Sequence, residues 1–303
     1  MDQTEVSARI RFVKDSWKDR AGEVRIGSGE DRRAQTSFQD VRIANARPLL
    51  EQGELDLDRN GFILTHHETS VRDFSNREEV ETTYYAEVCA LVKALTGAAV
   101  TVPLNYLTRS EKRGDDWVAA YARYVHLDCN EKMSKEWIKR TRDMGSLADV
   151  LECTRDTIIE FGFSSDPPER YTPGDSLASP PYSMAIYMCW QPIEHEVQRN
   201  PLTLIDPRSF DNDAMADYVL DGTYGDYQGA LGAMPFHHPE QRLYYFPRMQ
   251  TDELLVFKQL DTRPLPARQG CPHTSFDDPT SPLEPLGRRN VEVPVVAIFG
   301  SAS

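Results

Sequence analysis

Cysteine is scarce in this 303-residue sequence, and the five cysteines present are widely spaced, with no Cys-x-x-Cys pair. An odd number without paired spacing argues against a disulfide framework and against a thiolate zinc site. Basic residues are also few, because 34 Lys and Arg stand against 48 Asp and Glu, giving a net charge of −14. Such a chain repels phosphate backbones, so we expect no nucleic-acid partner.

Long apolar runs are missing as well. No stretch approaches the roughly 18 apolar residues of a membrane span, and the first residues lack the basic and apolar parts of a secretory signal. No asparagine begins an Asn-x-Ser/Thr acceptor. We therefore expect a cytoplasmic protein without a membrane partner.

Several motifs of common enzymes are absent too. The sequence contains no Gly-x-Ser-x-Gly, no phosphate-binding P-loop, no His-Glu-x-x-His and no Gly-x-Gly-x-x-Gly. These absences exclude the hydrolases, zinc proteases and nucleotide binders that such motifs reveal.

The composition is that of a globular protein, with 40% hydrophobic, 10% aromatic and 27% charged residues. A chain of this length can bury a full core, and no internal repeat divides it. We therefore predict a single domain over 1–303, in which 1–75 supply N-terminal elements that pack on the body formed by 76–303.

Two stretches have the apolar spacing of amphipathic helices. One covers 76–96, where Ser75 could cap the start and Gly97 ends the pattern. The other covers about 131–161, and Gly145 is expected to break it into two pieces. We expect both to pack outside a sheet.

The remaining pattern favours a β-rich core. We predict strands where β-branched and aromatic residues gather between Gly, Pro and Asp clusters, at 7–13, 99–104, 117–127, 182–190, 242–246, 253–260 and 291–299. The polar run from 14 to about 40 is predicted as a loop over the main body. Two long Pro-rich connectors, 164–181 and 263–287, are candidates for a lid over a functional site.

One short segment of the predicted strand 117–127 carries metal-ligating residues. On a strand, positions i and i+2 point to the same face, so His126 and Asp128 can converge on one ion. Two histidines and one carboxylate suit non-haem Fe(II), because they leave coordination positions open. The His-x-Asp/Glu pattern is weak by itself, since it also occurs at His66 and His238. His126 could equally be a half-buried polar residue beside a surface aspartate.

A third ligand would have to come from another strand. His273 lies 147 residues after His126 and precedes the last predicted strand. Fifteen residues later comes Arg288, whose guanidinium could pair with a dicarboxylate such as 2-oxoglutarate. The alternatives are a loop histidine and a solvated loop arginine.

Seven ordered motifs carry a family resemblance. They are Tyr84-Tyr85 with Leu95-Thr96-Gly97-Ala98, Val125-His126-Leu127-Asp128, Cys189-Trp190-Gln191-Pro192-Ile193, Asn200-Pro201-Leu202 with Ile205-Asp206, Asp252-Glu253-Leu254-Leu255-Val256-Phe257-Lys258, His273-Thr274-Ser275-Phe276 and Arg288-Arg289-Asn290-Val291-Glu292. Over roughly 80–300, the sequence resembles the fungal AsaB-like hydroxylase/desaturase family, which includes gibberellin desaturase-like proteins.

The resemblance implies a fold, cofactors and a site. It implies a mainly β fold with flanking α-helices, a double-stranded β-helix or cupin-like jelly roll, with its core within 76–303. It also implies an Fe(II)/2-oxoglutarate-dependent dioxygenase that uses O₂ to hydroxylate or desaturate a small molecule of fungal secondary metabolism, with ascorbate as the assay reductant. His126, Asp128 and His273 match the iron ligands, and Arg288 matches the cosubstrate-binding arginine.

Two positions depart from the family pattern. Gln191 and Pro294 stand where the family usually has arginine. We predict that Gln191 binds the cofactor through its amide, which can donate a hydrogen bond but not a charge-assisted pair. Four aromatic residues are candidates for the substrate pocket, although each could equally be core: Tyr124, Trp190, Tyr106 and Phe276.

Two other functions stay open at this point. A catalytically silent member of the fold could bind a metabolite or a partner protein, and the changes at Gln191 and Pro294 prompt that reading. A cupin-type metal dioxygenase or isomerase could keep the metal without 2-oxoglutarate. Release of succinate would separate this last class from the main prediction.

Overall fold

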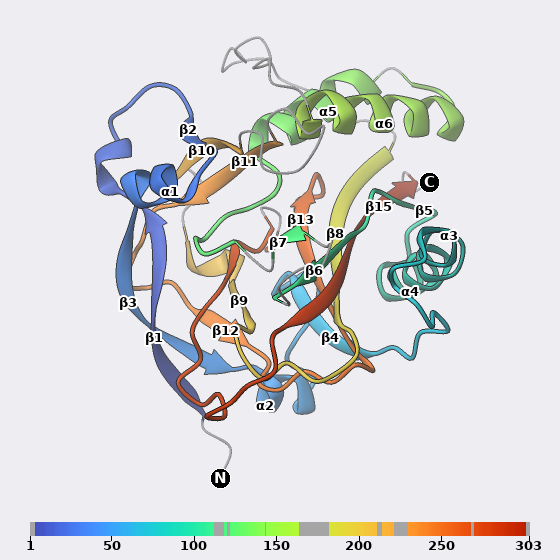
Figure 1. Ribbon diagram of the computed structural model, residues 1–303. Helices are drawn as coiled ribbons and strands as arrows, with labels where there is room; N and C mark the ends of the chain where they lie inside the picture. Colours follow the sequence, from blue (N-terminus) through green and yellow to red (C-terminus); the bar gives the residue numbers. More distant parts are fainter. Residues whose placement is uncertain are drawn as a thin grey trace.

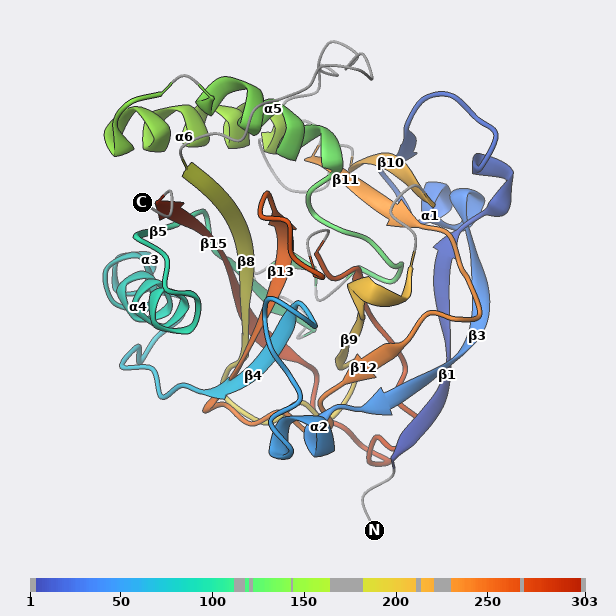
Figure 2. The ribbon, with the colours of Figure 1, turned by 180° about the vertical axis from the view of Figure 1, so that it is seen from behind.

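The computed structural model describes residues 4–111, 118–119, 122–142, 144–163, 182–210, 214–220, 230–267 and 270–300. In these residues the chain is mainly β, and the longer helices lie outside the sheets (Figure 1). Two large sheets face each other, as the view from behind also shows (Figure 2). The predicted mainly β fold with flanking helices and the predicted jelly-roll class are confirmed.

The five-stranded sheet has the order β1-β3-β12-β9-β14 and combines strands from both ends of the sequence. Its strands are β1 (Glu5–Val13), β3 (Thr36–Asn45), β9 (Leu202–Ile205), β12 (Leu243–Tyr245) and β14 (His273–Ser275). β1 is antiparallel to β3, β12 runs parallel to β3, and β14 pairs with β9. The N-terminal strands are therefore members of a main sheet.

The seven-stranded sheet has the order β4-β13-β8-β15-β6-β7, with β5 also paired to β15. Its strands are β4 (Phe62–His66), β5 (Val100–Pro103), β6 (Leu107–Ser110), β7 (Val118–Ala119), β8 (Tyr182–Pro192), β13 (Glu253–Asp261) and β15 (Arg289–Gly300). A smaller sheet is formed by β11 (Ala230–Pro235), β10 (Met215–Leu220) and β2 (Val24–Ile26).

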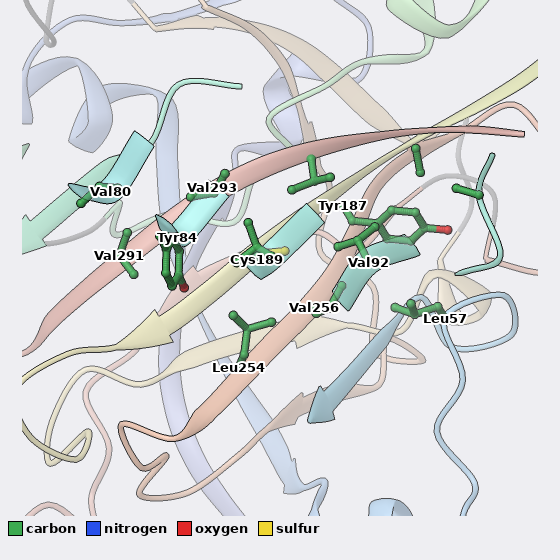
Figure 3. Close-up of a cluster of buried hydrophobic side chains, with 14 of the residues drawn as sticks. Leu57, Val80, Tyr84, Val92, Tyr187, Cys189, Leu254, Val256, Val291 and Val293 are labelled. Carbon is green, nitrogen blue, oxygen red and sulfur yellow. The ribbon is translucent and has the colours of Figure 1, made fainter. Parts of the chain in front are cut away.

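Alternation along β8 separates two apolar cores. Met188 and Trp190 face inward and pack with residues of β4, β9 and β13 between the two large sheets. Tyr187 and Cys189 face outward and pack under a helix (Figure 3). Because successive strand residues point to opposite faces, a strand buried on both sides has no polar face.

The helix on the outer face starts at α3 (Arg77–Glu79), continues through a π-helical turn (η2, Val80–Tyr84) and ends as α4 (Tyr85–Thr96). Gly97 follows in a left-handed conformation with φ of 69°, which a glycine adopts without strain. The prediction of a helix over 76–96 is confirmed. The cap is Asn76, whose side chain accepts from the Glu79 N–H, and not Ser75.

Two further helices cover one end of the inner face of the seven-stranded sheet. They are α5 (Glu131–Thr141) and α6 (Leu147–Phe163), which confirms the prediction of a helical stretch broken near Gly145. Trp137 is buried between them and donates its indole N–H to Thr154 at 2.5 Å. Among the described residues, no helix combines the length and apolarity required to cross a bilayer.

The prediction of a loop from 14 to about 40 is wrong. This stretch contains η1 (Asp15–Trp17), β2, α1 (Gly29–Gln35) and the first half of β3. Ser28 caps α1 by accepting from the Asp31 N–H at 3.1 Å, and β2 pairs with β10, far along the chain. Short polar elements that depend on such distant pairing lack the apolar periodicity by which strands and helices are recognised.

Other predicted elements were placed correctly or only in part. The structure has β1, β5, β8, β12, β13 and β15 where strands were expected. Among the described residues of the expected strand 117–127, only β7 is a strand, His126 and Leu127 form isolated bridges, and residues 122–125 are not in a strand. Two short helices, α2 (Arg47–Glu51) and η3 (Pro207–Ser209), were not predicted.

The two Pro-rich connectors have different outcomes. Residues 164–181 lie outside the described residues. The connector 263–287 contains β14 and is fixed to the body by backbone hydrogen bonds, from Ala267 to Asp58 at 3.2 Å and from Cys271 to Lys258 at 2.7 Å. It therefore belongs to the scaffold of the site.

Candidate metal centre

The segment around His126 is held by single bridges to two strands. His126 pairs with His273 on β14 through two backbone hydrogen bonds of 3.1 and 2.9 Å. The next residue, Leu127, pairs with Ala233 on β11, and its N–H donates to the Ala233 carbonyl at 2.7 Å. These bridges bring together two histidines that are far apart in the sequence.

The three predicted ligands meet at one point. The Nε2 atom of His126 lies 3.4 Å from Asp128 Oδ1, and Nε2 of His273 lies 3.8 Å from Asp128 Oδ2. One ligand atom from each residue lies within 4.8 Å of the others. His126 and His273 are buried, whereas the Asp128 side chain is 38% exposed.

Backbone carbonyls orient the rings of both histidines. Nδ1 of His126 lies 2.9 Å from the Tyr124 carbonyl, and Nδ1 of His273 lies 3.3 Å from the Cys271 carbonyl. Since a carbonyl only accepts, each Nδ1 carries a proton, and each ring directs its Nε2 towards Asp128. Metal-binding histidines are commonly oriented by this kind of hydrogen bond.

The electrostatics favour a neutral imidazole at His273 beside an ionised carboxyl group at Asp128. The pKa of His273 is lowered to about 3, and burial is the largest cause. The neighbouring His126 also lowers this pKa, and its effect is larger than the opposite effect of Asp128. Burial opposes ionisation of Asp128, but the hydrogen bond from His126 and the proximity of His273 outweigh that effect and lower the pKa of this carboxyl group. Such a donor set is typical of sites for a divalent transition metal.

A small cavity connects the metal-ligand residues to Arg288. It has a volume of about 40 Å³ and is lined by His126, Asp128, His273, Trp190 and Arg288, among others. Arg288 is buried, and its Nη1 donates to the Ser275 hydroxyl at 2.9 Å and to the Asn200 carbonyl at 2.6 Å. Ser275 lies two residues after His273 on β14, so both side chains share a face of that strand.

An ion pair also lines this cavity. Arg109 on β6 and Glu292 on β15 are joined at 2.6 Å through Nε and at 2.5 Å through Nη2. Sequence reasoning missed both residues, as well as Ser275. The alternation from His273 could have indicated Ser275, whereas Arg109 and Glu292 meet only through the pairing of β6 with β15.

Gln191, predicted to bind the cofactor, is placed on the other side of the sheet. Its Oε1 accepts from the Tyr84 hydroxyl and lies 2.8 Å from Nδ1 of His67, and its Nε2 donates to the carbonyls of His67 and Thr251. Because Trp190 faces the cavity, its neighbour Gln191 must face α4. The prediction for Gln191 is therefore corrected, since this side chain anchors the outer helix.

The four predicted pocket aromatics divide in the same way. Trp190 lines the cavity, and its ring centroid lies 5.5 Å from the Arg288 guanidinium carbon. Tyr124 does not line it, but its ring packs on His126 at 5.2 Å between centroids. Tyr106 packs on Tyr85 next to α4, and Phe276 packs on Tyr245 within the core of the five-stranded sheet, so neither lies in the cavity.

A second group of possible metal ligands lies on the surface. His66, Glu68 and Asp252 have ligand atoms near one another, and all three are exposed. Their exposure distinguishes them from the buried histidines of the first group.

Comparison with known proteins identifies the family and the fold of the chain. A protein-family model described as an oxidoreductase/YMDC permease-like domain matches residues 11–161 and 175–298, which is most of the chain. The solved structure of the iron and alpha-ketoglutarate-dependent endoperoxidase NvfI superposes with a TM-score of 0.71 and 20% sequence identity, covering 98% of this chain and 99% of that one. That likeness shows that the two proteins share a fold.

Curated relatives extend over nearly the same length. The hydroxylase/desaturase efuI of Hormonema carpetanum is 26% identical, with 89% of this chain and 88% of efuI aligned. The alpha-ketoglutarate-dependent dioxygenase phiK of Fungal sp. (strain ATCC 74256) is 24% identical, with 88% and 86% aligned. The chain belongs to this oxidoreductase family, among the fungal hydroxylase/desaturases and Fe(II)/2-oxoglutarate-dependent dioxygenases that its motifs resemble.

Proposed function

We propose that this protein is an Fe(II)/2-oxoglutarate-dependent dioxygenase whose metal is bound by His126, Asp128 and His273. The observation that carries the proposal is the convergence of these three ligand groups in a cavity that also contains a buried arginine. The names of the relatives support the same chemistry.

The residues present fit the metal. Two imidazole Nε2 atoms and a carboxylate approach from one side, which leaves further positions for a cosubstrate and O₂. The hydrogen bonds at both Nδ1 atoms fix the orientation of the imidazole rings, so metal binding would require little rearrangement of these side chains.

Arg288 fits the distal carboxylate of 2-oxoglutarate. A guanidinium pairs with a carboxylate through two parallel hydrogen bonds, and Ser275 and the Asn200 carbonyl keep this guanidinium in one orientation. Burial strengthens such a pair, since water competes less for the charged groups. Gln191 has no part in this assignment.

Bound Fe(II) and 2-oxoglutarate would supply, with O₂, the oxidising power to hydroxylate or desaturate an unactivated C–H bond. The protein's own part is to orient and to exclude water. Arg288 and Asp128 supply charged groups to the cavity. Its apolar walls, which keep water from the reacting groups, are formed by Trp190, Met188 and Phe257.

The substrate in this proposal is a small-molecule intermediate of fungal secondary metabolism. The relatives named as hydroxylase/desaturase and dioxygenase support this class.

We also infer that 1–303 form one oxygenase domain. The N-terminal strands β1 and β3 belong to the five-stranded sheet, and β4 belongs to the seven-stranded sheet. The five free cysteines support the cytoplasm as the compartment.

The test is an anaerobic titration with Fe(II) and 2-oxoglutarate, followed through the weak visible metal-to-ligand band. We expect a band in the wild-type protein and none in His126→Ala, with ascorbate present in the later turnover assays. Bound iron without a band would instead support a metal enzyme that does not use 2-oxoglutarate. Absence of iron binding in the wild type would overturn the proposal and favour a silent binding protein.

A further inference from the structure

The N–H of Asp128 is bound by a side chain and not by a strand. The two preceding residues, His126 and Leu127, donate their N–H groups to β14 and β11. Pairing ends there, and the Asp128 N–H donates to Oε1 of Gln259 at 3.1 Å. Gln259 belongs to β13, so three consecutive amides are held by three different strands.

A β-bulge places Gln259 for this contact. On β13, Lys258 pairs with Tyr187 of β8 and Leu260 pairs with Ile186, so Gln259 has no opposite residue on β8. A bulged residue leaves the regular alternation, and its side chain can be aimed in a direction that a regular strand does not offer. Here the direction is towards Asp128.

The bulge also packs closely against the segment that precedes His273. Gly270 has φ of 81°, and a Cβ at this position would lie 2.4 Å from the Gln259 carbonyl oxygen. Only glycine allows the two backbones to approach so closely. The following residue, Cys271, donates its N–H to Lys258 at 2.7 Å, which ties the segment before His273 to the same bulge.

Gln259 is poorly suited to a purely structural role. It is 1% exposed, and within the described residues its Nε2 is buried without a hydrogen-bond partner. A buried donor that is not satisfied costs free energy, and an apolar side chain of similar size would avoid that cost. The residue also lines a cavity of about 130 Å³ together with Leu127, Cys129 and Asn130, the chain neighbours of Asp128.

We propose that Gln259 is a positioning residue for the metal centre. By holding the Asp128 backbone, it directs the carboxylate towards the two Nε2 atoms, and the bulge connects this action to the segment before His273. The inference rests on the proposed function, because it assumes that the three residues bind Fe(II).

The experiment compares Gln259→Leu with a matched control, Gln191→Leu, in the full-length protein. Fe(II) affinity is measured by anaerobic titration, and thermal stability by the melting temperature. We expect Gln259→Leu to bind Fe(II) about 10-fold to 100-fold more weakly, the range found when partners of metal ligands are removed. Its melting temperature should stay unchanged or rise, because the unsatisfied amide is gone.

The control should behave in the opposite way. Gln191 makes its hydrogen bonds on the outer face, so Gln191→Leu should lower the melting temperature and leave Fe(II) affinity unchanged. A third variant, Gln259→Glu, keeps an acceptor oxygen at the same reach and should recover most of the lost affinity.

The outcomes are distinguishable. If Gln259→Leu binds Fe(II) as tightly as the wild type, the positioning role is overturned while the proposed function stands. If both affinity and melting temperature fall and Gln259→Glu recovers neither, the role is overturned as well, since a loosened core would explain both. If the wild type itself binds no Fe(II), it is the proposed function that has failed.

Discussion

Gln191 and Gln259 are buried glutamines on neighbouring strands of one sheet, yet their surroundings differ. On the outer face, the Gln191 amide contacts Tyr84, His67 and Thr251, so both its oxygen and its nitrogen are engaged. On the inner side, Gln259 accepts one hydrogen bond from Asp128. A fully bonded amide stabilises the fold, whereas a half-bonded amide is expected where function demands it.

Charged side chains repeat this contrast. On the outer face, Lys258 and Asp261 are both buried and lie 2.6 Å apart, and Arg263 reaches Asp261 at 2.8 Å. In the cavity, the Asp128 carboxylate faces two imidazole rings. The ion pairs on the outer face stabilise the sheet. In the cavity, Asp128 and the two histidines are instead the proposed ligands of a metal ion.

Removal of the carboxylate that we propose as a metal ligand gives the largest expected effect. In Asp128→Ala, Fe(II) affinity should fall more than about 100-fold, because loss of a ligand exceeds the loss caused by removing a partner of a ligand. The melting temperature should change little, since the inner arrangement is not there for stability. Titration calorimetry and thermal melts measure the two quantities, and a large drop in stability would break the comparison.

Removal of the outer carboxylate should act on stability alone. Asp261→Ala removes the buried carboxylate that Lys258 and Arg263 share and leaves them only the half-exposed Asp58, and breaking a buried pair in this way costs about 3–5 kcal/mol. Urea unfolding measures the change in the free energy of unfolding. Fe(II) affinity per folded molecule should match the wild type, and a weaker affinity would show that the two faces are coupled.

A smaller effect is expected for Arg288→Lys. Lysine keeps the charge but loses the planar fork, so the Kd for 2-oxoglutarate should rise about 10-fold, equivalent to about 1.4 kcal/mol. Binding of Fe(II) alone should not change. The neighbouring Arg289→Lys is the matched control and should leave both affinities as they are. Equal behaviour of the two variants would exclude Arg288 as the cosubstrate anchor.

The smallest effect is expected for Tyr84→Phe. This change removes one donor to Gln191, whose Oε1 keeps its contact with His67. The loss of one hydrogen bond should cost about 1 kcal/mol, or about 2–4 °C in melting temperature. Any change in the visible band of the Fe(II)/2-oxoglutarate complex would contradict the separation of the two faces.

Much of the fold follows from local pattern. The helix over 76–96 was predictable because its apolar spacing and Gly97 are local signals, and the long buried strands β8, β13 and β15 have continuous apolar runs. The stretch from 14 to 40 was not predictable, because β2 forms by pairing with a strand almost 200 residues away. Such pairing has no counterpart in local composition.

The types of residue in the candidate site were predictable, but the directions of their side chains were not. Residue types and the family motifs pointed to His126, Asp128, His273 and Arg288, which line one cavity in the structure. The family motif misplaced Gln191, since Trp190 and Gln191 are adjacent and only the packing of β8 decides which of them faces inward. The role of Gln259 depends on a bulge, and a bulge is set by the pairing of two strands.

The backbone bridge between His126 and His273 also bears on synthesis of the protein. The two residues are 147 positions apart, so the ligand set cannot exist until the later segment has emerged from the ribosome and β14 has docked beside β9. Distant pairing of this kind forms late in folding. A nascent chain that has not yet exposed His273 therefore holds only two of the three proposed iron ligands, and Arg288 and Glu292 of the cavity wall emerge later still.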